Sequence, residues 1–221
     1  MKQVVAVWDL PTRLFHWGLV GLFAGMWYTG SQGGDWLRYH IWCGEGVAVL
    51  LLFRMIWGFF GSQTARFSDF LPRPGVIRRY LRGQLSEHQL PGHNPLGGLM
   101  VLALILVLVC QVATGLFASD VDSYLYNGPL AHLIDAARSE SVTDVHKTLF
   151  NLILLMVGVH VAAVLYHRVF KRHHLIGAML SGRKAFDGEV APLYFAPLRL
   201  ALISLLVSAG VVLALVVGAG G

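Results

Sequence analysis

Five of the ten histidines in this 221-residue chain lie in strongly apolar stretches, where an ionisable side chain is costly and is usually functional. A neutral imidazole buried in hydrocarbon without a partner leaves its polar nitrogens unsatisfied. Imidazole is also the commonest protein ligand for metals. The five are His16, His40, His146, His160 and His167, and the pattern favours metal ligation over a purely structural role for the first four.

The spacing of these histidines predicts two pairs. His146 and His160 are 14 residues apart, which in a helix places them within about 40° of one face and ~21 Å apart along the axis. His16 and His40 stand near the starts of two earlier apolar stretches. If successive helices cross a membrane in alternating directions, His16 comes to the level of His160, and His40 to the level of His146. Two facing helices could then hold one metal centre at each level.

The ligand set points to haem held without a covalent link. The chain has no C-x-x-C-H motif, and its two cysteines, Cys43 and Cys110, lie inside apolar stretches. Two histidine ligands leave no open position on the iron, which favours electron transfer over oxygen chemistry. We therefore predict two haem b groups, an inner one on His16 and His160 and an outer one on His40 and His146.

Other polar residues in these stretches have assignable roles. His167 is a competing inner ligand, but the basic residues beside it favour an interfacial or propionate-contacting role. Arg54 follows His40 by 14 residues on the same face, near the expected inner haem, and Arg13 precedes His16 by three. Both guanidinium groups are candidates to neutralise a haem propionate, with extension to lipid headgroups as the alternative. We expect the remaining polar groups to form hydrogen bonds between helices: Gln111, Thr114 and Asn151.

The composition predicts an integral membrane protein. Only 13% of the residues are charged, against roughly a quarter in soluble domains, and 56% are hydrophobic. Asp9 and Pro11 are helix-start signals before the first apolar stretch. Because a spanning helix needs about 20 residues, we predict five transmembrane helices, over Leu14–Gly30, His40–Phe60, Leu96–Ala118, Val145–Phe170 and Ala196–Gly218. The first four form an all-α di-haem bundle within residues 1–186, and residues 187–221 carry a fifth packing or anchoring helix.

The distribution of charge predicts the orientation. Lys and Arg gather in the N-terminal tail and in the loops after the second and fourth helices, whereas the other side has few basic residues and a cluster of acidic ones. By the positive-inside rule the N-terminus is cytoplasmic and the C-terminus periplasmic, in a bacterial inner membrane. The first apolar stretch lacks a signal-peptide cleavage pattern, so we expect it to be retained. The net charge of +5 therefore reflects topology and not nucleic-acid binding. The acidic cluster is Asp120, Asp122, Asp135, Glu140 and Asp144.

Four other histidines lie in predicted polar loops, and we expect them to be solvated or to face lipid headgroups. They are His88, His93, His173 and His174.

Several motifs resemble the bacterial cytochrome b561 family, which includes the cytochrome b subunits of nickel–iron hydrogenases. The resemblance covers roughly residues 4–186. It implies two b-type haems, electron exchange with a membrane quinone, and a redox enzyme subunit or c-type cytochrome on the outer face. Lys147 departs from the acidic residue that is common after this histidine in the family. The motifs are Val7–Trp17, His40–Gly44, Arg54–Gly58, His93–Gly98, His146 with His160, and Ala178–Lys184.

The leading hypothesis is a respiratory-chain protein that passes electrons between the membrane quinone pool and a periplasmic redox partner, with quinol or quinone oxidoreductase activity. We expect the quinone site near the inner haem, around Arg13 and Arg54, with the outer side as the alternative. A membrane anchor within a larger redox complex is a second hypothesis. A histidine-based metal or proton transporter is a third, disfavoured because the chain shows no repeats or paired broken helices.

Overall fold

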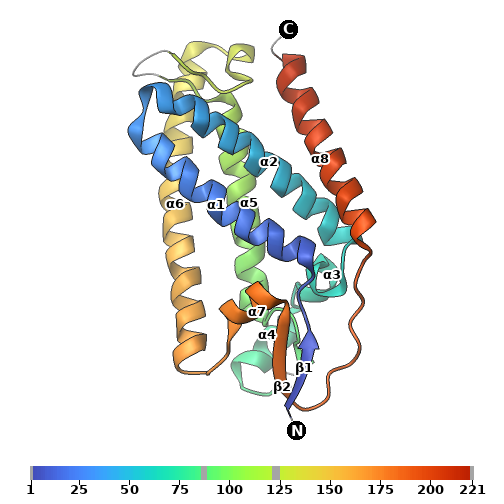
Figure 1. The fold of residues 1–221 in the computed structure, drawn as a ribbon. Helices are drawn as coiled ribbons and strands as arrows, with labels where there is room; N and C mark the ends of the chain where they lie inside the picture. Colours follow the sequence, from blue (N-terminus) through green and yellow to red (C-terminus); the bar gives the residue numbers. More distant parts are fainter. Residues whose placement is uncertain (1, 86–88, 121–124, 220–221) are drawn as a thin grey trace. The chain divides into compact units, whose positions relative to one another are not determined.

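The computed structural model describes residues 2–85, 89–120 and 125–219, so His88 and Asp122 lie outside the described residues. Within the described part, long helices alternate with short elements (Figure 1). The helices are α1 (Leu10–Gln32), α2 (Leu37–Phe60), α3 (Phe67–Phe70), α4 (Pro74–Leu81), α5 (Pro95–Phe117), α6 (Ala136–Val169), α7 (Leu175–Ser181) and α8 (Leu198–Ala219). Two strands, β1 (Lys2–Ala6) and β2 (Arg183–Asp187), and the 3-10 turns η1 (Gly34–Trp36), η2 (Gln63–Ala65) and η4 (Ala131–Leu133) complete the described elements.

Each predicted apolar stretch is helical, and the protein has several helices that can span a bilayer. Among the described residues, four helices are long and apolar enough: Gly34–Phe60, Pro95–Phe117, Ala136–Val169 and Leu198–Gly218. The remaining one, α1, has 23 residues but is less apolar, because glycines and polar aromatic residues interrupt its aliphatic run. Five spans are therefore not confirmed. Leu155 on α6 and Leu213 on α8 stay more than 60% exposed, as lipid-facing side chains do.

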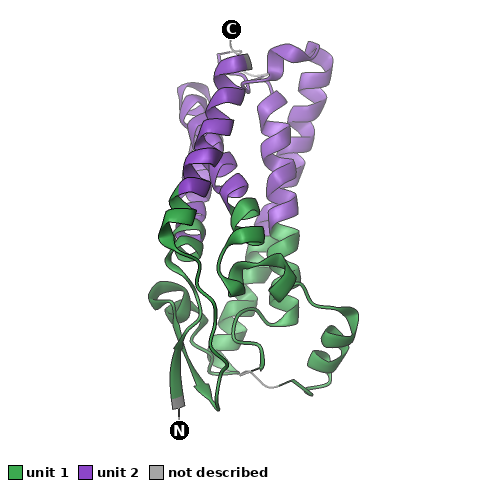
Figure 2. Cartoon of the chain, turned by 90° about the vertical axis from the view of Figure 1, so that its right-hand side faces the viewer, with its two compact units in different colours: residues 1–15, 54–104, 156–202 green, residues 16–53, 105–155, 203–221 purple. Residues whose placement is uncertain are grey.

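The chain divides into two compact units, and each long helix contributes residues to both (Figure 2). Unit 1 consists of residues 1–15, 54–104 and 156–202. Unit 2 consists of residues 16–53, 105–155 and 203–221. This division does not test the predicted boundary after residue 186, which stays a prediction.

Unit 1 is organised by a small antiparallel sheet that the sequence did not indicate. β1 pairs with β2 from Lys2 opposite Asp187 to Ala6 opposite Arg183, and Val7, Phe186 and Val190 form a buried cluster beside it. The backbone N–H groups of Val7 and Trp8 donate to the carbonyl of Gly182, which has a φ of 79°. Because only glycine adopts this conformation readily, Gly182 lets the chain turn from α7 into β2 against the N-terminal segment.

The start of α1 confirms the predicted signal. Oδ1 of Asp9 accepts a hydrogen bond from the Thr12 backbone N–H at 2.7 Å, which caps the helix. Oδ2 of the same carboxylate accepts a hydrogen bond from the indole N–H of Trp57 at 2.9 Å. Asp9 and Trp57 are both buried, so one side chain starts α1 and ties it to the end of α2 within unit 1.

In unit 2, the end of α5 and the first turns of α6 are joined by hydrogen bonds. The Ser139 hydroxyl donates to the Phe117 carbonyl at 2.7 Å, and the Thr143 hydroxyl accepts from the Ser119 backbone N–H at 2.9 Å. Gly128 packs against the α5 carbonyls of Gly115 and Leu116, where a side chain would not fit. These contacts hold the segment of α6 that carries His146.

Candidate functional site

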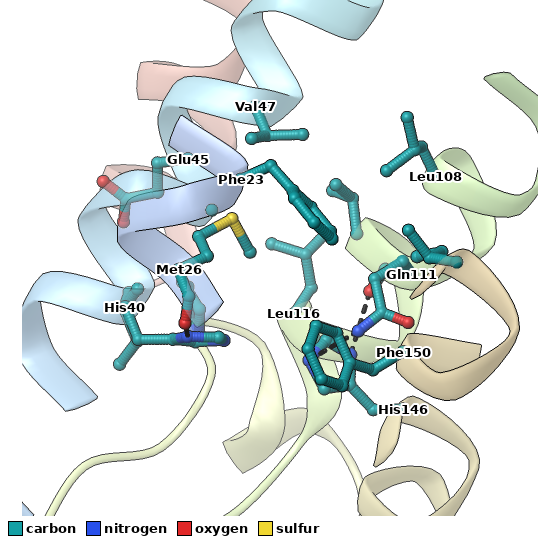
Figure 3. Close-up of a pocket in the computed structure, with 16 residues that line it drawn as sticks. Phe23, Met26, His40, Glu45, Val47, Leu108, Gln111, Leu116, His146 and Phe150 are labelled. Atoms are coloured by element: carbon teal, nitrogen blue, oxygen red, sulfur yellow. Dashed lines mark hydrogen bonds between the residues drawn. The ribbon is translucent and has the colours of Figure 1, made fainter. Parts of the chain in front are cut away.

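A cavity in unit 2 is lined by residues of α1, α2, α5 and α6, and it contains two of the predicted ligands (Figure 3). His40 comes from α2 and His146 from α6, and both side chains are half-buried. Most of the other lining residues are apolar, among them Phe23, Leu108 and Phe150. The cavity therefore places two imidazoles in a largely water-excluding environment.

Each of these imidazoles is oriented by a backbone carbonyl of a neighbouring helix. Nδ1 of His40 lies 2.9 Å from the Met26 carbonyl oxygen of α1, and Nδ1 of His146 lies 3.0 Å from the Gln111 carbonyl oxygen of α5. A carbonyl oxygen can only accept, so Nδ1 carries the hydrogen and donates in both rings. Nε2 is then left with its lone pair, which is the form that binds a metal, and the Nδ1 hydrogen bond is the usual second contact of a metal-binding histidine.

The distance between the two rings fits one metal between them. Their centroids are 6.2 Å apart with an angle of 80° between the planes. Two imidazoles bound on opposite sides of a metal, each at a bond length of about 2 Å, have centroids about 6 Å apart. The residues present therefore fit an iron held by His40 and His146, although their ligation itself stays a prediction.

Gln111 and Thr114 form the predicted interhelical hydrogen bonds. The Gln111 side-chain amide donates to Nε2 of His146 at 3.1 Å, and the Thr114 hydroxyl lies 3.1 Å from Nδ1 of the same ring. The amide of Gln111 must turn aside when His146 Nε2 binds another group. Asn151, the third residue in this prediction, has an exposed side chain.

The two predicted inner ligands are divided between the units, because His16 belongs to unit 2 and His160 to unit 1. Their pairing stays a prediction. His167 lies further along α6 with its Nδ1 3.3 Å from Nδ1 of His173, so it contacts the segment that follows the helix.

Unit 1 contains the two predicted arginines, of which Arg54 is buried and Arg13 is half-buried. Arg54 is only 3% exposed, its guanidinium lies 5.1 Å from the centroid of Phe67, and its Nη1 is sealed without a hydrogen-bond partner. Nη1 of Arg13 donates to the Leu180 carbonyl at 2.5 Å, while its Nε is sealed without a partner. Buried guanidinium N–H groups without an acceptor are costly, and a carboxylate such as a haem propionate would satisfy them. Unit 1 therefore offers the donors that the propionate hypothesis requires.

His93 was predicted to be a loop residue that is solvated or faces lipid headgroups, and this prediction is wrong, because its side chain is half-buried and packed against aromatic rings. Its ring packs 4.7 Å from Trp8 and 4.9 Å from Phe70 between centroids, and its Nδ1 is sealed without a partner. Burial lowers the pKa of His93 to about 3, with smaller contributions from the nearby Arg54 charge and from His160. No local pattern reveals this burial, because Trp8 and Phe70 come from distant parts of the sequence.

The fold and this site define a class of protein: a multi-pass membrane protein in which two half-buried histidines line one cavity. A family model described as prokaryotic cytochrome b561 matches residues 7–182, and the chain belongs to this family. It is thus a b-type cytochrome, which carries haem b in a membrane and takes part in electron transport.

Two proteins of similar sequence have names that are consistent with this family. The chain is 26% identical over 218 residues to a protein of Rhizobium leguminosarum bv. viciae named probable Ni/Fe-hydrogenase B-type cytochrome subunit, covering 84% of this chain and 90% of the relative. A protein of Azotobacter vinelandii with the same name is 25% identical over 219 residues, covering 85% and 91% of the two chains. No solved structure matches the chain significantly.

Proposed function

We propose that this cytochrome holds two haem b groups and transfers electrons between the membrane quinone pool and a periplasmic redox partner. The observation that carries the proposal is the pair His40 and His146, 6.2 Å apart, each with Nδ1 on a backbone carbonyl. Because the relatives are named hydrogenase subunits, a nickel–iron hydrogenase is the first candidate partner, and a c-type cytochrome is the second.

At the outer site, the work of the chain is to hold two ligands and exclude water. Haem b bound there supplies a one-electron iron couple. The carbonyls of Met26 and Gln111 keep Nδ1 of each ring as the donor, which holds Nε2 toward the metal and raises its basicity. His16 and His160 perform the corresponding ligation at the inner site.

Near the inner site, the buried polar groups of unit 1 support propionate and quinone binding. Arg54 and Arg13 present donors without acceptors, and a propionate carboxylate or a quinone carbonyl oxygen can accept from either. His93 is neutral at physiological pH because its pKa is lowered to about 3. It therefore offers the quinone a hydrogen-bonding nitrogen without adding a second buried positive charge beside Arg54.

The charges of the two units support the predicted topology. Unit 1 contains 14 basic and 5 acidic residues, a net charge of +9, whereas unit 2 contains 3 basic and 7 acidic residues, a net charge of −4. We infer that the basic unit faces the cytoplasm of a bacterium, with five spanning helices including α1. A reporter fused after Gly221 should be active only on the periplasmic side, and activity only in the cytoplasm would contradict this orientation.

The role as a membrane anchor for a larger redox complex is retained as a second candidate, because the relatives are named as subunits. The two candidate functions differ in whether a quinol can reduce the haems. Purified protein should contain two low-spin haems per chain by pyridine haemochrome analysis, and a quinol analogue should reduce both. One haem per chain would contradict the di-haem proposal, and two haems that no quinol reduces would favour the anchor.

A further inference from the structure

The two carbonyls that orient His40 and His146 share a local arrangement. Met26 precedes Gly30 by four residues on α1, and Gln111 precedes Gly115 by four residues on α5. In both places the imidazole lies directly over the glycine. A Cβ at Gly30 would lie 2.9 Å from Nδ1 and 3.1 Å from Cε1 of His40, and a Cβ at Gly115 would lie 2.9 Å from Cε1 of His146. Real Cβ atoms essentially never approach another atom closer than 3.0 Å.

The geometry of the α-helix explains the coincidence. The carbonyl of residue i−4 points along the helix toward the N–H of residue i. A ring nitrogen from another helix that reaches this carbonyl must therefore pass over residue i, and only glycine leaves that surface open. Neither glycine is required by its backbone, since both lie within helices and neither has a positive φ. Glycine inside a helix is less favourable than alanine by about 1 kcal/mol, so a packing reason is needed at these positions.

We propose that Gly30 and Gly115 are positioning residues for the outer haem. Each glycine forms a seat, which here means an open helix surface over which one imidazole reaches the carbonyl one turn earlier. This contact fixes the rotation of the ring and the direction of Nε2. The inference rests on the proposed ligation by His40 and His146. It adds that two glycines on helices without any ligand to this haem determine how its ligands are presented.

The chain offers matched controls on its long helices. At Gly21 on α1 and Gly158 on α6, an added Cβ would meet nothing within 4 Å apart from its chain neighbours and its own helix backbone, so alanine fits at both positions. The variants Gly30→Ala and Gly115→Ala each add one methyl group under a ring. Gly21→Ala and Gly158→Ala add the same group in open space.

The experiment uses the full-length chain purified from membranes, with haem content, low-spin EPR signals and a redox titration as readouts. In Gly30→Ala and Gly115→Ala, we expect the affinity for the outer haem to fall about 10-fold, or the EPR g-values and midpoint potential of this haem to shift. The signal of the inner haem should stay unchanged. The two control variants should match the wild type. His40→Ala marks which signal belongs to the outer haem.

The outcomes separate this inference from the proposal on which it rests. If His40→Ala leaves both signals intact, the proposed ligation fails. If His40→Ala removes one signal but both seat variants keep that signal with unchanged g-values and potential, the ligation stands and the inference is overturned. Should Gly30→Ala fail to accumulate, Gly115→Ala on a different helix carries the test. Loss of both haems in both seat variants also overturns a role specific to the outer ligands.

Discussion

His40 and His146 in unit 2 differ from Arg54, Arg13 and His93 in unit 1 in how their buried polar atoms are satisfied. His40 and His146 both have their Nδ1 groups on carbonyl oxygens, so the rings are oriented by the protein alone. In unit 1, Nη1 of Arg54, Nε of Arg13 and Nδ1 of His93 are sealed from solvent with no hydrogen-bond partner. The comparison teaches that the protein by itself orients the two imidazoles of unit 2, whereas these three polar atoms of unit 1 find no acceptor or donor within the described residues.

Removing a ligand from each region tests this comparison with the largest effect. His146→Ala should abolish the outer haem and His160→Ala the inner haem, although both residues lie on α6. Difference spectra and EPR should show one low-spin signal lost in each variant, and the lost signals should differ. If both variants lose the same signal, the assignment of the two histidines to different haems is wrong. Loss of the inner haem in His167→Ala, with retention in His160→Ala, would show that His167 is the inner ligand.

Neutralising Arg54 tests the unpartnered donors of unit 1. Arg54→Gln removes a charged donor, and a hydrogen bond to a charged group contributes about 1.5 kcal/mol or more, so quinol-driven reduction should slow roughly 10-fold. The inner midpoint potential should fall, because a nearby positive charge stabilises the reduced haem. Stopped-flow reduction and a redox titration measure the two effects.

Arg78→Gln is the matched control, since Arg78 lies in the same unit on the short surface helix α4, which has no buried residues. It should leave the rate and the potential unchanged. An equal effect of both variants would indicate that Arg54 acts only through the overall charge of unit 1.

The burial of His93 predicts a pH dependence of stability. The pKa of His93 is about 3 in the folded chain, whereas an unfolded histidine has a pKa near 6.5. The unfolded state therefore binds the additional proton between these values, so acidification from pH 6.5 toward 3 destabilises the folded state by up to about 1.4 kcal/mol per pH unit. In thermal unfolding, the Tm of the wild type should fall more steeply from pH 6.5 to 4.5 than that of His93→Phe, which keeps an aromatic ring beside Trp8 and Phe70. Parallel Tm curves would contradict the lowered pKa.

A last expected effect concerns the stability of the start of α1 in unit 1. Asp9→Ala removes the N-cap hydrogen bond to Thr12 and the acceptor for Trp57, and should lower the free energy of unfolding by about 1–3 kcal/mol. Asp9→Asn keeps an oxygen for the cap and should be closer to the wild type. Denaturant unfolding in detergent measures both. No difference between Ala and Asn would indicate that these hydrogen bonds contribute little.

The sequence by itself determined the membrane class and the positions of the long helices, and it singled out His40 and His146, which line the cavity of unit 2. These properties follow from local chemistry: long apolar runs must be helical in a bilayer because every backbone polar group needs an internal partner, and a 14-residue spacing returns to one helix face. The start of α1 at Asp9 was also readable, because an N-cap bonds to its own helix. Whether α1 crosses the membrane was harder to predict, because its glycines and polar aromatic residues lower its mean hydropathy.

Only the tertiary structure decided which groups surround those histidines. The acceptor for His40 is 14 residues away on another helix, and the acceptor for His146 is 35 residues away. The seats at Gly30 and Gly115 follow from the same helix packing. His93 is half-buried, with its Nδ1 sealed, because Trp8 and Phe70 pack against its ring. The strands β1 and β2 pair although they are separated by almost the whole chain. Backbone acceptors and contacts of this kind carry no residue-type signature, so helix packing alone selects them.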